Sequence, residues 1–597
     1  MSNKIVNDFS ITVGTENGSG SQTANTTILR ALFRMGIPVS GKNLFPSNIQ
    51  GLPTWYTIRV NKDGFTARRD THEIVVCMNA KSFAKDLADV APGGAFFYDD
   101  SINLDVTRDD IQVYPMPVKE IMREQADVPA KLKNLVANMV YVGILAQNIG
   151  IDLEKIKAAL EFHFKGKQKP IDLNFNTIQA AANWAKENLA KKDPYFVEPM
   201  NKTEGLIMAD GNTAAALGSI YGGVHFVSWY PITPASSLAE QLVEYLPVLR
   251  KREDGKNTYA VVQAEDELAA IGMAIGAGWA GLRAMTSTSG PGLSLMTEFA
   301  GLAYYGEVPV VIWDVQRVGP STGLPTRTSQ GDLTFTHYMG HGDTEQVILL
   351  PGTVNECFEF GWKAFDIAEH MQTPVFVLSD LELGMNQWMT EPFKYPDTPM
   401  DRGKVLWEED LEKIKDWGRY RDVDGDGITY RTLPGNKHPN SAYFMRGTGH
   451  DENARYSEND EDWVKNMDRL KRKYHNAAKF IPEPIIDETN DANIGIVAFG
   501  STDLAVKEAR HELETEAGLK SDSMRIRGIP FSETVPEFIQ SHEHNYVVEM
   551  NRDGQMYQLL LTEYPHLAEK LTSIAFNDGL PATAKWIKDS ILEKEAN

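Results

Sequence analysis

Short apolar runs of strand length alternate with helical segments along most of this chain. Residues 259–263 and 308–313 are two such runs in the middle of the sequence, and segments rich in alanine and glycine follow them. Strands that alternate with helices form mostly parallel sheets with helices on both faces. The pattern therefore predicts an α/β fold class with three α/β domains.

The alternation is interrupted by polar stretches, and these predict the domain boundaries. A chain of 597 residues is long enough for three to five domains. Apolar strands at 9–14, 73–78, 494–501 and 545–550 place α/β domains at both ends of the sequence. The expected division is an α/β domain at 1–190, a linker at 191–205, a second α/β domain at 206–390, a polar excursion with one long helix (458–479) at 391–485, and a third α/β domain at 486–597.

The charge balance and the cysteine count exclude several classes of protein. Lys and Arg total 59 against 82 Asp and Glu, a net charge of -23, which argues against nucleic-acid binding. No apolar run approaches the ~20 residues of a membrane span, and the polar start MSNKIVNDFS is not a signal peptide, so we expect a cytoplasmic protein without a membrane partner. Two cysteines, Cys77 and Cys357, cannot supply four thiolates to an iron–sulfur cluster. Any such cluster must lie on another chain.

Two further motifs are compatible with more than one interpretation. The loop Gly14–Gly20 lies between a strand and a helix and suits either a bound phosphate or, with more support, a tight turn. The acidic loop at 422–427 resembles an EF-hand or a thiamine-diphosphate Mg²⁺ motif in part. Leu433 stands where the EF-hand needs a glutamate, and no apolar strand precedes the loop, so a hydrated turn is expected and no metal ligand is assigned.

The second α/β domain carries the candidate site, beginning with a proline-fixed loop. The sequence YPITPASS at 230–237 follows an apolar stretch, and its two prolines restrict the backbone around Thr233. Open α/β sheets bind ligands at the carboxyl ends of their strands. Either a hydroxyl is presented to a ligand there, or the loop is a structural turn.

Next, a carboxylate precedes a helix of small residues. The sequence QAEDE at 263–267 leads into AAIGMAIGAG, in which Gly272 and Gly276 share one face. A flat ligand or another backbone can approach such a face closely. Three acids, Glu265, Asp266 and Glu267, open this helix; one or two of them can be caps of its N-terminus, and a carboxylate on the same edge would lie against whatever packs on the glycine face.

Two more constrained loops complete the constellation. TSTSGPG at 286–292 follows a strand, and GPSTGLPTRT at 319–328 places Arg327 between prolines and glycines. Arginine is the side chain best shaped to bind a carboxylate with two hydrogen bonds. A hydroxyl, a carboxylate and a guanidinium on three strand-end loops together indicate a binding site.

These four motifs, in this order, resemble the α subunits of the 2-oxoacid:ferredoxin oxidoreductases, most closely the 2-oxoglutarate:ferredoxin enzymes. The resemblance covers nearly the whole chain. It implies that residues 1–190 correspond to a fused γ domain, 206–390 to a pyrimidine-type thiamine-diphosphate domain, and 486–597 to a transketolase C-terminal-like domain.

The resemblance also implies a reaction and roles for individual residues. Such enzymes oxidatively decarboxylate a 2-oxoacid with coenzyme A as co-substrate and pass electrons to ferredoxin, and some run in reverse to fix CO₂. By family position Glu267 contacts the aminopyrimidine of thiamine diphosphate and favours its activated tautomer, and Glu265 is the alternative if the register differs. Thr233 touches cofactor or substrate, and Arg327 grips a substrate carboxylate. The implied cofactor-binding residues are Tyr230, Pro231, Ile232, Thr233, Glu267, Thr288, Ser289 and Gly290.

The partners implied by the family supply the rest of the chemistry. A separate β subunit holds the diphosphate, Mg²⁺ and a [4Fe–4S] cluster, and an αβ dimer of dimers is expected, with ferredoxin as the electron acceptor. Pyruvate or a branched-chain or aryl 2-oxoacid are alternative substrates. A non-catalytic scaffold subunit is the alternative from another functional class.

Overall fold

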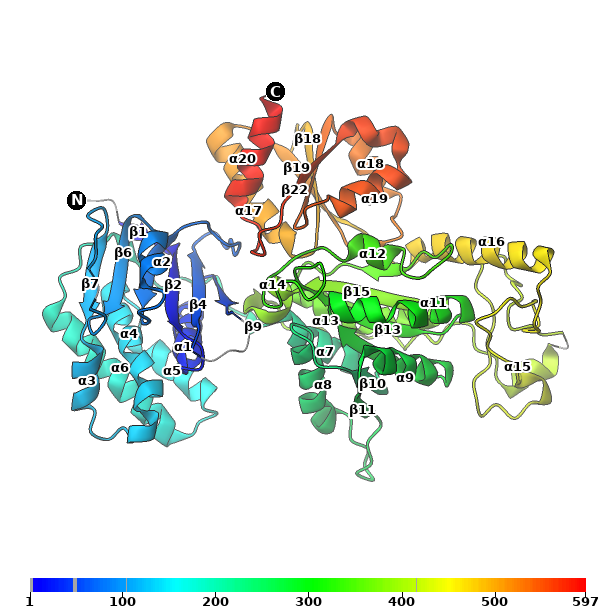
Figure 1. The fold of residues 1–597 in the computed structure, drawn as a ribbon, viewed down its shortest axis with the longest axis horizontal. Helices are drawn as coiled ribbons and strands as arrows, with labels where there is room; N and C mark the ends of the chain where they lie inside the picture. The colour runs from blue at the N-terminus through cyan, green and yellow to red at the C-terminus, as the bar shows by residue number, and fades with distance from the viewer. Residues whose placement is uncertain (1–3, 47–50, 104, 415, 597) are drawn as a thin grey trace. The chain divides into compact units, whose positions relative to one another are not determined.

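The computed structural model describes residues 4–46, 51–103, 105–414 and 416–596, which divide into two compact units (Figure 1). Unit 1 comprises residues 1–209, 386–392 and 583–586. Unit 2 comprises residues 210–385, 393–582 and 587–597. None of the helices within the described residues is long and apolar enough to cross a bilayer.

Unit 1 is built on a six-stranded mixed sheet in the order β3-β4-β2-β5-β6-β7. Strands β2, β5, β6 and β7 run parallel, and β4 pairs antiparallel with both β2 and β3. The strands are β2 (Asp8–Glu16), β3 (Val39–Leu44), β4 (Pro53–Asn61), β5 (His72–Cys77), β6 (Val90–Asp99) and β7 (Gln112–Met116). The helices are α1 (Ser21–Arg34), α2 (Phe83–Asp89), α3 (Val118–Glu124), α4 (Lys133–Ile149), α5 (Leu153–His163) and α6 (Gln168–Asn188).

The segment expected as a linker, 191–205, packs onto unit 1. Its strand β8 (Tyr195–Phe196) pairs with β1 (Ile5–Val6), and Tyr195 and Val197 are buried in the core of the unit. Burial of these apolar side chains outweighs the polar composition of the surrounding residues. In the same unit β9 (Ile207–Ala209) pairs with β16 (Trp388–Thr390), which is 179 or more residues later in the sequence.

Unit 2 contains a seven-stranded sheet in the order β11-β10-β12-β13-β15-β14-β20. Its six sequential strands are parallel, and the short β20 joins the edge in the antiparallel direction. The strands are β10 (Phe226–Trp229), β11 (Ala260–Gln263), β12 (Ala284–Thr288), β13 (Val310–Gln316), β14 (Val347–Leu349), β15 (Pro374–Asp380) and β20 (Gly528–Ile529). The interior strand β13 is buried along its whole length, as the apolar run at 308–313 predicts, and the polar residues Asp314 and Gln316 are buried with it.

The direction of the strand connections reverses beside β10. The chain passes from β10 through α8 to one neighbour, β11, and then through α9 past β10 to β12. Right-handed crossovers in opposite directions place α8 and α9 on opposite faces of the sheet. The other helices follow this division: α7 and α13 contact each other and α7 contacts α8, whereas α10 and α11 contact α9. The bounds are α7 (Gly211–Tyr221), α8 (Ser236–Leu249), α9 (Glu267–Trp279), α10 (Gly290–Leu295), α11 (Thr297–Gly306), α12 (Leu333–His337), α13 (Val354–Met371) and α14 (Leu381–Met385).

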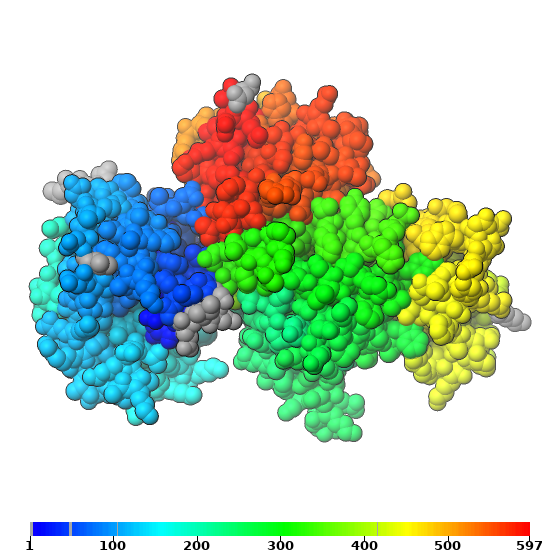
Figure 2. Space-filling model, in the orientation of Figure 1, coloured from blue at the N-terminus to red at the C-terminus, as the bar shows by residue number. Residues whose placement is uncertain are grey.

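A second sheet of unit 2 lies in the C-terminal part of the chain, with the order β17-β19-β18-β21-β22. Its side chains share one hydrophobic cluster with the larger sheet, so that Ile348 and Phe376 belong to the same core as Val497 and Met524. Figure 2 shows this orange-red part seated against the green part of unit 2. The elements are β17 (Ile485–Asp487), β18 (Ile494–Phe499), β19 (Ser521–Ile526), β21 (His544–Glu549), β22 (Leu571–Ala575), α17 (Asp503–Ala517), α18 (Thr534–Ser541), α19 (Gln555–Glu563) and α20 (Ala584–Glu595).

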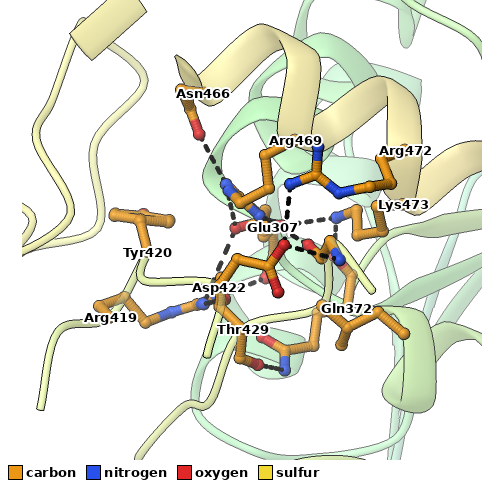
Figure 3. Close-up of polar contacts among 12 residues, drawn as sticks. Glu307, Gln372, Arg419, Tyr420, Asp422, Thr429, Asn466, Arg469, Arg472 and Lys473 are labelled. Atoms are coloured by element: carbon orange, nitrogen blue, oxygen red, sulfur yellow. Dashed lines mark hydrogen bonds and ion pairs between the residues drawn. The ribbon is translucent and has the colours of Figure 1, made fainter. Parts of the chain in front are cut away.

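The described residues of the polar excursion, drawn yellow in Figure 2, form two α-helices and otherwise little regular structure. They are α15 (Glu408–Lys413) and the long charged helix α16 (Asp460–Asn476), which is shorter than the expected 458–479. Figure 3 shows how α16 is anchored: Arg469 and Lys473 reach the buried carboxylate of Glu307, which follows α11. The excursion is therefore fixed to the sheet domain by charged groups.

Candidate active site

The candidate site lies at the carboxyl ends of β10, β11, β12 and β13, where the strand connections diverge. The loop 230–235 follows β10, Glu267 follows β11, and the motif 286–292 covers the end of β12 and the start of α10. The register pairs Trp229 with Gln263 and Thr288 with Asp314, so these loops leave the sheet side by side. Reversal of the connections opens a crevice at this position in α/β sheets, which is where their ligands bind.

Glu267 is the buried acid of this group. It is the first residue of α9, and Asp266 caps the helix by accepting a hydrogen bond of 2.7 Å from the Ala269 N–H. Glu267 is 7% exposed, whereas Glu265 lies on the surface. A Cβ atom at position 292 would lie 2.7 Å from Glu267 Oε1 and would collide with Thr288 Oγ1. Gly292 therefore lets the Glu267 carboxylate approach the 286–292 motif closely.

The hydroxyl-rich motif 286–292 contains polar atoms without protein partners. Among the described residues, the hydroxyls of Thr286, Ser287 and Ser289 are buried and make no hydrogen bond. The Thr288 hydroxyl donates a long bond of 3.3 Å to the Ser289 carbonyl. Buried polar groups are nearly always satisfied, so a cluster of orphaned hydroxyls at strand ends indicates a ligand that completes them. This donor set suits a polar ligand beside Glu267.

The Thr233 loop is held from two sides. The Asn212 amide donates 3.0 Å to the Pro234 carbonyl, and Arg317 Nη1 donates 2.7 Å to the Thr233 carbonyl. Tyr230 and Pro231 are exposed at the rim of the loop, whereas Ile232 and Thr233 are half-buried. The loop is therefore rigid at Thr233 and open toward a ligand or partner at its rim.

Arg317 is a residue of the site that the sequence motifs did not single out. It is 6% exposed, its Nη2 donates 3.1 Å to the Thr322 carbonyl, and its buried Nε has no hydrogen-bond partner in the part of the chain that the structure describes. Arg317 thus ties the loop after β13 to the Thr233 loop. In the sequence, the position of Arg317 directly after an apolar strand was the signal that could have marked it as a site residue.

Arg327 lies farther along that same loop. Its Nη1 donates to the carbonyl and hydroxyl of Thr326, at 2.9 and 3.1 Å, and a Cβ atom at position 579 would lie 3.0 Å from the Arg327 Cβ. Burial lowers the pKa of Arg327 below its usual range. The structure therefore places Arg327 against the C-terminal part of unit 2 and Arg317 against Thr233.

Two further carboxyl groups lie beneath the 286–292 motif. Asp314, in β13, is fully buried, and its pKa is raised by burial and by the neighbouring Asp332. Burial raises the pKa of Asp332 to about 6, although Asp314 and Arg317 act to lower it. A Cβ atom at position 290 would lie 3.0 Å from both carboxylate oxygens of Asp332. Neither acid was predicted from the sequence.

Metal coordination finds no support in the acidic loop. Lys404 Nζ contacts Asp424 at 2.6 Å and Asp426 at 2.9 Å, and Arg472 contacts Asp422 at 2.9 Å. Protein cations therefore neutralise the carboxylates of this loop. Within the described residues, no group of three or more His, Cys, Asp and Glu side chains is arranged to hold a metal ion.

The glycine-rich loop at 14–20 forms a turn between β2 and α1. The Ser19 N–H donates 3.0 Å to the Glu16 carbonyl, and the hydroxyls of Thr15 and Ser21 lie 2.8 Å apart. These contacts account for the turn interpretation. Both cysteines are free and buried, and burial raises the pKa of each thiol.

Comparison with known proteins adds family membership to this geometry. The protein family described as "Pyruvate flavodoxin/ferredoxin oxidoreductase, thiamine diP-bdg" matches residues 217–404, and the family "Pyruvate ferredoxin/flavodoxin oxidoreductase" matches residues 10–184. The first of these contains the whole candidate site.

Relatives match over most of their length. A 2-oxoacid:ferredoxin oxidoreductase subunit alpha of Aeropyrum pernix is 30% identical, over 93% of this chain and 92% of the relative. The 2-oxoglutarate synthase subunit KorA of Methanothermobacter marburgensis is 38% identical, over 58% of this chain and 88% of the relative.

A solved structure agrees in fold along nearly the entire chain. It is the 2-oxoglutarate:ferredoxin oxidoreductase from Magnetococcus marinus with 2-oxoglutarate, coenzyme A and succinyl-CoA bound, and it has a TM-score of 0.88 at 30% identity, covering 98% of this chain and 99% of that chain. The resemblance expected from the four motifs, and the α/β fold class with its thiamine-diphosphate-binding domain, are thereby confirmed. The chain belongs to the family of 2-oxoacid:ferredoxin oxidoreductase α subunits, which are parts of oxidoreductase enzymes.

Proposed function

We propose that this chain is the α subunit, with a fused γ-like domain, of a 2-oxoglutarate:ferredoxin oxidoreductase. The reaction would convert 2-oxoglutarate and coenzyme A into succinyl-CoA and CO₂, with two electrons passed singly to ferredoxin, and its reverse would fix CO₂. The observation that carries the proposal is the end-to-end likeness to the Magnetococcus marinus enzyme, whose structure holds 2-oxoglutarate and succinyl-CoA. The KorA relatives support the same substrate.

The residues of unit 2 suit one half of a thiamine-dependent site. Thiamine diphosphate, when bound, supplies a nucleophilic carbon and an electron sink for decarboxylation. Glu267, buried at the start of α9, would accept a hydrogen bond from the pyrimidine ring and hold a proton there. The pyrimidine ring would contact the Thr233 loop, which includes Tyr230, Pro231 and Ile232. It would also contact Thr288, Ser289 and Gly290, beside the unpartnered hydroxyls of the 286–292 motif.

The rest of the site would come from a partner. A β subunit would hold the diphosphate, Mg²⁺ and a [4Fe–4S] cluster. The support is that the two cysteines of this chain are buried and too few for a cluster, and that protein cations neutralise its acidic loop. Assembly as a dimer of αβ units, with ferredoxin as the acceptor, is part of the same proposal.

A panel of 2-oxoacids tests the substrate. The purified complex should reduce ferredoxin or a viologen dye with a higher kcat/KM for 2-oxoglutarate than for pyruvate or for branched-chain and aryl 2-oxoacids. The name of the matching domain family makes pyruvate the second candidate. A higher kcat/KM for pyruvate would reassign the substrate and leave the reaction class intact.

A matched pair of variants tests whether this chain is catalytic or a scaffold. Glu267→Gln should lower kcat of the assembled complex at least about 100-fold, because a general acid–base group contributes about 10²–10⁴-fold. Glu265→Gln, on the surface two residues away, is the control and should retain wild-type kcat. Equal rates for both variants would favour a non-catalytic scaffold.

A further inference from the structure

Beneath the 286–292 motif, Asp314 and Asp332 carry buried carboxyl oxygens that accept no hydrogen bond from the N–H and O–H groups of the described residues. Asp314 is 0% exposed, and neither of its carboxyl oxygens receives a hydrogen bond from an N–H or O–H group of the described residues. Part of Asp332 reaches the surface, but its Oδ2 is likewise buried and without a donor. Gln316, on the same face of β13 as Asp314, accepts a hydrogen bond of 3.1 Å from the Asp332 N–H, which brings the Asp332 carboxyl beside that of Asp314.

Two ionised carboxylates cannot remain in this arrangement. Both are acceptors only, and their charges repel in a buried environment, so one proton must lie between them. The resulting O–H···O⁻ bond satisfies one oxygen of each carboxyl and leaves a single negative charge on the pair. Asp314 is fully buried, whereas Asp332 is partly exposed and the charge of Arg317 acts on it, so Asp314 is the donor and Asp332 carries the charge.

The two carboxyls lie next to the 286–292 motif and are connected through Gln316 and Arg317 to the Thr233 loop. Asp314 pairs in register with Thr288, and the carboxylate of Asp332 lies directly against Gly290. The Asp332 N–H donates 3.1 Å to the Gln316 side chain, next to Arg317, which binds the Thr233 loop. The charge of Arg317 acts on the pair, whereas Thr288, Leu378 and Gly290 on the elements packed around it carry no charge.

We propose that Asp314 and Asp332 share one proton and act as positioning residues, setting the 286–292 motif and Arg317 for cofactor binding. The charge-assisted bond locks the end of β13 to the start of α12 and presses Asp332 against the backbone at Gly290. The negative charge on Asp332 balances the guanidinium of Arg317. The assignment of the bound group as thiamine diphosphate rests on the proposed function, but the shared proton does not.

Infrared spectroscopy of the full-length chain tests the shared proton without any activity. At pH 8 the wild-type protein should show the carbonyl stretch of a protonated carboxyl, shifted in D₂O, and Asp314→Asn should lose it. Asp343→Asn, at an exposed position in the loop before β14, is the control and should keep the band. A wild-type–minus–Asp314→Asn difference spectrum without this band would overturn the proposal.

The apparent affinity for thiamine diphosphate in the complex tests the positioning role. Asp332→Asn should raise the apparent Kd for the cofactor about tenfold with a smaller change in kcat at saturation, because it removes one charge-assisted contact. Asp314→Asn should cost less, since an amide N–H still donates to the Asp332 carboxylate.

The pH dependence separates positioning from simple packing. Below pH about 6, protonation of Asp332 should weaken cofactor affinity in the wild type and in Asp314→Asn. In Asp332→Asn this loss should be absent, and any remaining change in affinity with pH reports the titration of the cofactor itself. Asp332→Asn at pH 8 should match the wild type at pH 5. The positioning role would be overturned if cofactor affinity had the same pH profile in the wild type and in Asp332→Asn. It would also be overturned if Asp332→Asn and Asp314→Asn lost cofactor affinity equally.

The failures of the two proposals are distinguishable. A wild-type complex that does not oxidise any 2-oxoacid would refute the proposed function, while the infrared band would still report the shared proton. A missing band in an active complex would refute the carboxyl pair and leave the function standing.

Discussion

At the scale of single residues, burial decides which of the polar side chains near the strand ends can act on a ligand. Glu265 and Glu267 are two positions apart, yet the first is exposed and the second is buried against Gly292. Arg317 and Arg327 belong to one loop, and Arg317 is the one bound to Thr233. Identical residue types therefore differ in role through their surroundings.

Replacing Arg327 tests its assignment to the substrate. If Arg327 binds a carboxylate of the 2-oxoacid, Arg327→Ala should reduce kcat/KM by about 2–4 kcal/mol of transition-state binding, mostly through KM. Steady-state kinetics of the complex measure this, with the exposed Arg252→Ala as control. Unchanged kinetics for Arg327→Ala, together with a raised KM for Arg317→Ala, would move the role to Arg317.

At the scale of secondary-structure elements, buried ion pairs attach the excursion to the sheet domain. The carboxylate of Glu307 contacts Arg469 at 2.9 and 3.0 Å, Lys473 at 2.7 Å and Arg419 at 3.8 Å (Figure 3). Burial by itself would raise the pKa of Glu307, but the three cations outweigh it and hold that pKa well below its usual range. One carboxylate thus neutralises part of a larger buried positive charge.

Removing that carboxylate should destabilise unit 2. Glu307→Gln leaves three buried cations without their counter-ion, so we expect the free energy of unfolding to fall by about 3–5 kcal/mol. Urea denaturation followed by tryptophan fluorescence measures the change. Glu298→Gln, on the exposed face of the preceding helix α11, should change it by less than about 0.5 kcal/mol. Similar stabilities for the two variants would show that the cluster does not hold the excursion.

At the scale of the whole molecule, polar contacts supplement the shared core where the two sheets of unit 2 meet. The Ser501 hydroxyl donates 2.5 Å to Asp380, and the Gln330 side chain bonds both the Phe499 carbonyl and the Thr502 hydroxyl, at 2.8 Å each. Burial raises the pKa of Asp380 to about 6, although Ser501 and a backbone N–H act to lower it. The junction is therefore sensitive to pH.

The sign of that sensitivity follows from proton binding. Between about pH 4 and 6 the folded protein holds the Asp380 proton more tightly than the unfolded chain, so the stabilisation from this group is complete below that window and is lost as the pH rises through it. The free energy of unfolding of the wild type, minus that of Asp380→Asn, should fall by about 2–3 kcal/mol across the window and then stay level. Denaturation at several pH values measures this difference, with the exposed Asp343→Asn as a flat control; a difference that rises with pH would contradict the assignment.

The isolated chain should be incomplete as a catalyst. Expressed alone, it should show no visible absorption from an iron–sulfur cluster and no turnover, because its two cysteines are single, buried thiols. Co-expression with the partner chain should give a complex that has both the iron–sulfur absorption and turnover. Tight cofactor binding and turnover by the chain alone would refute the half-site proposal.

The sequence by itself determined the α/β class and the order of the site motifs. Apolar strand runs and helical spacing are local properties, so β13 and α5 could be predicted from their own residues. The proline- and glycine-rich loops after the strands were evident for the same reason. The cysteine count needed no structure at all.

Only the tertiary structure decided which distant side chains meet. Asp314 and Asp332, the link from Arg317 to Thr233, and the packing of residues 195–197 onto unit 1 depend on strand order and register. Loops carry no periodic pattern, and strand order arises from the burial of side chains far apart in the sequence. Contacts of this kind are set by the packed core, and no local run of residues encodes them.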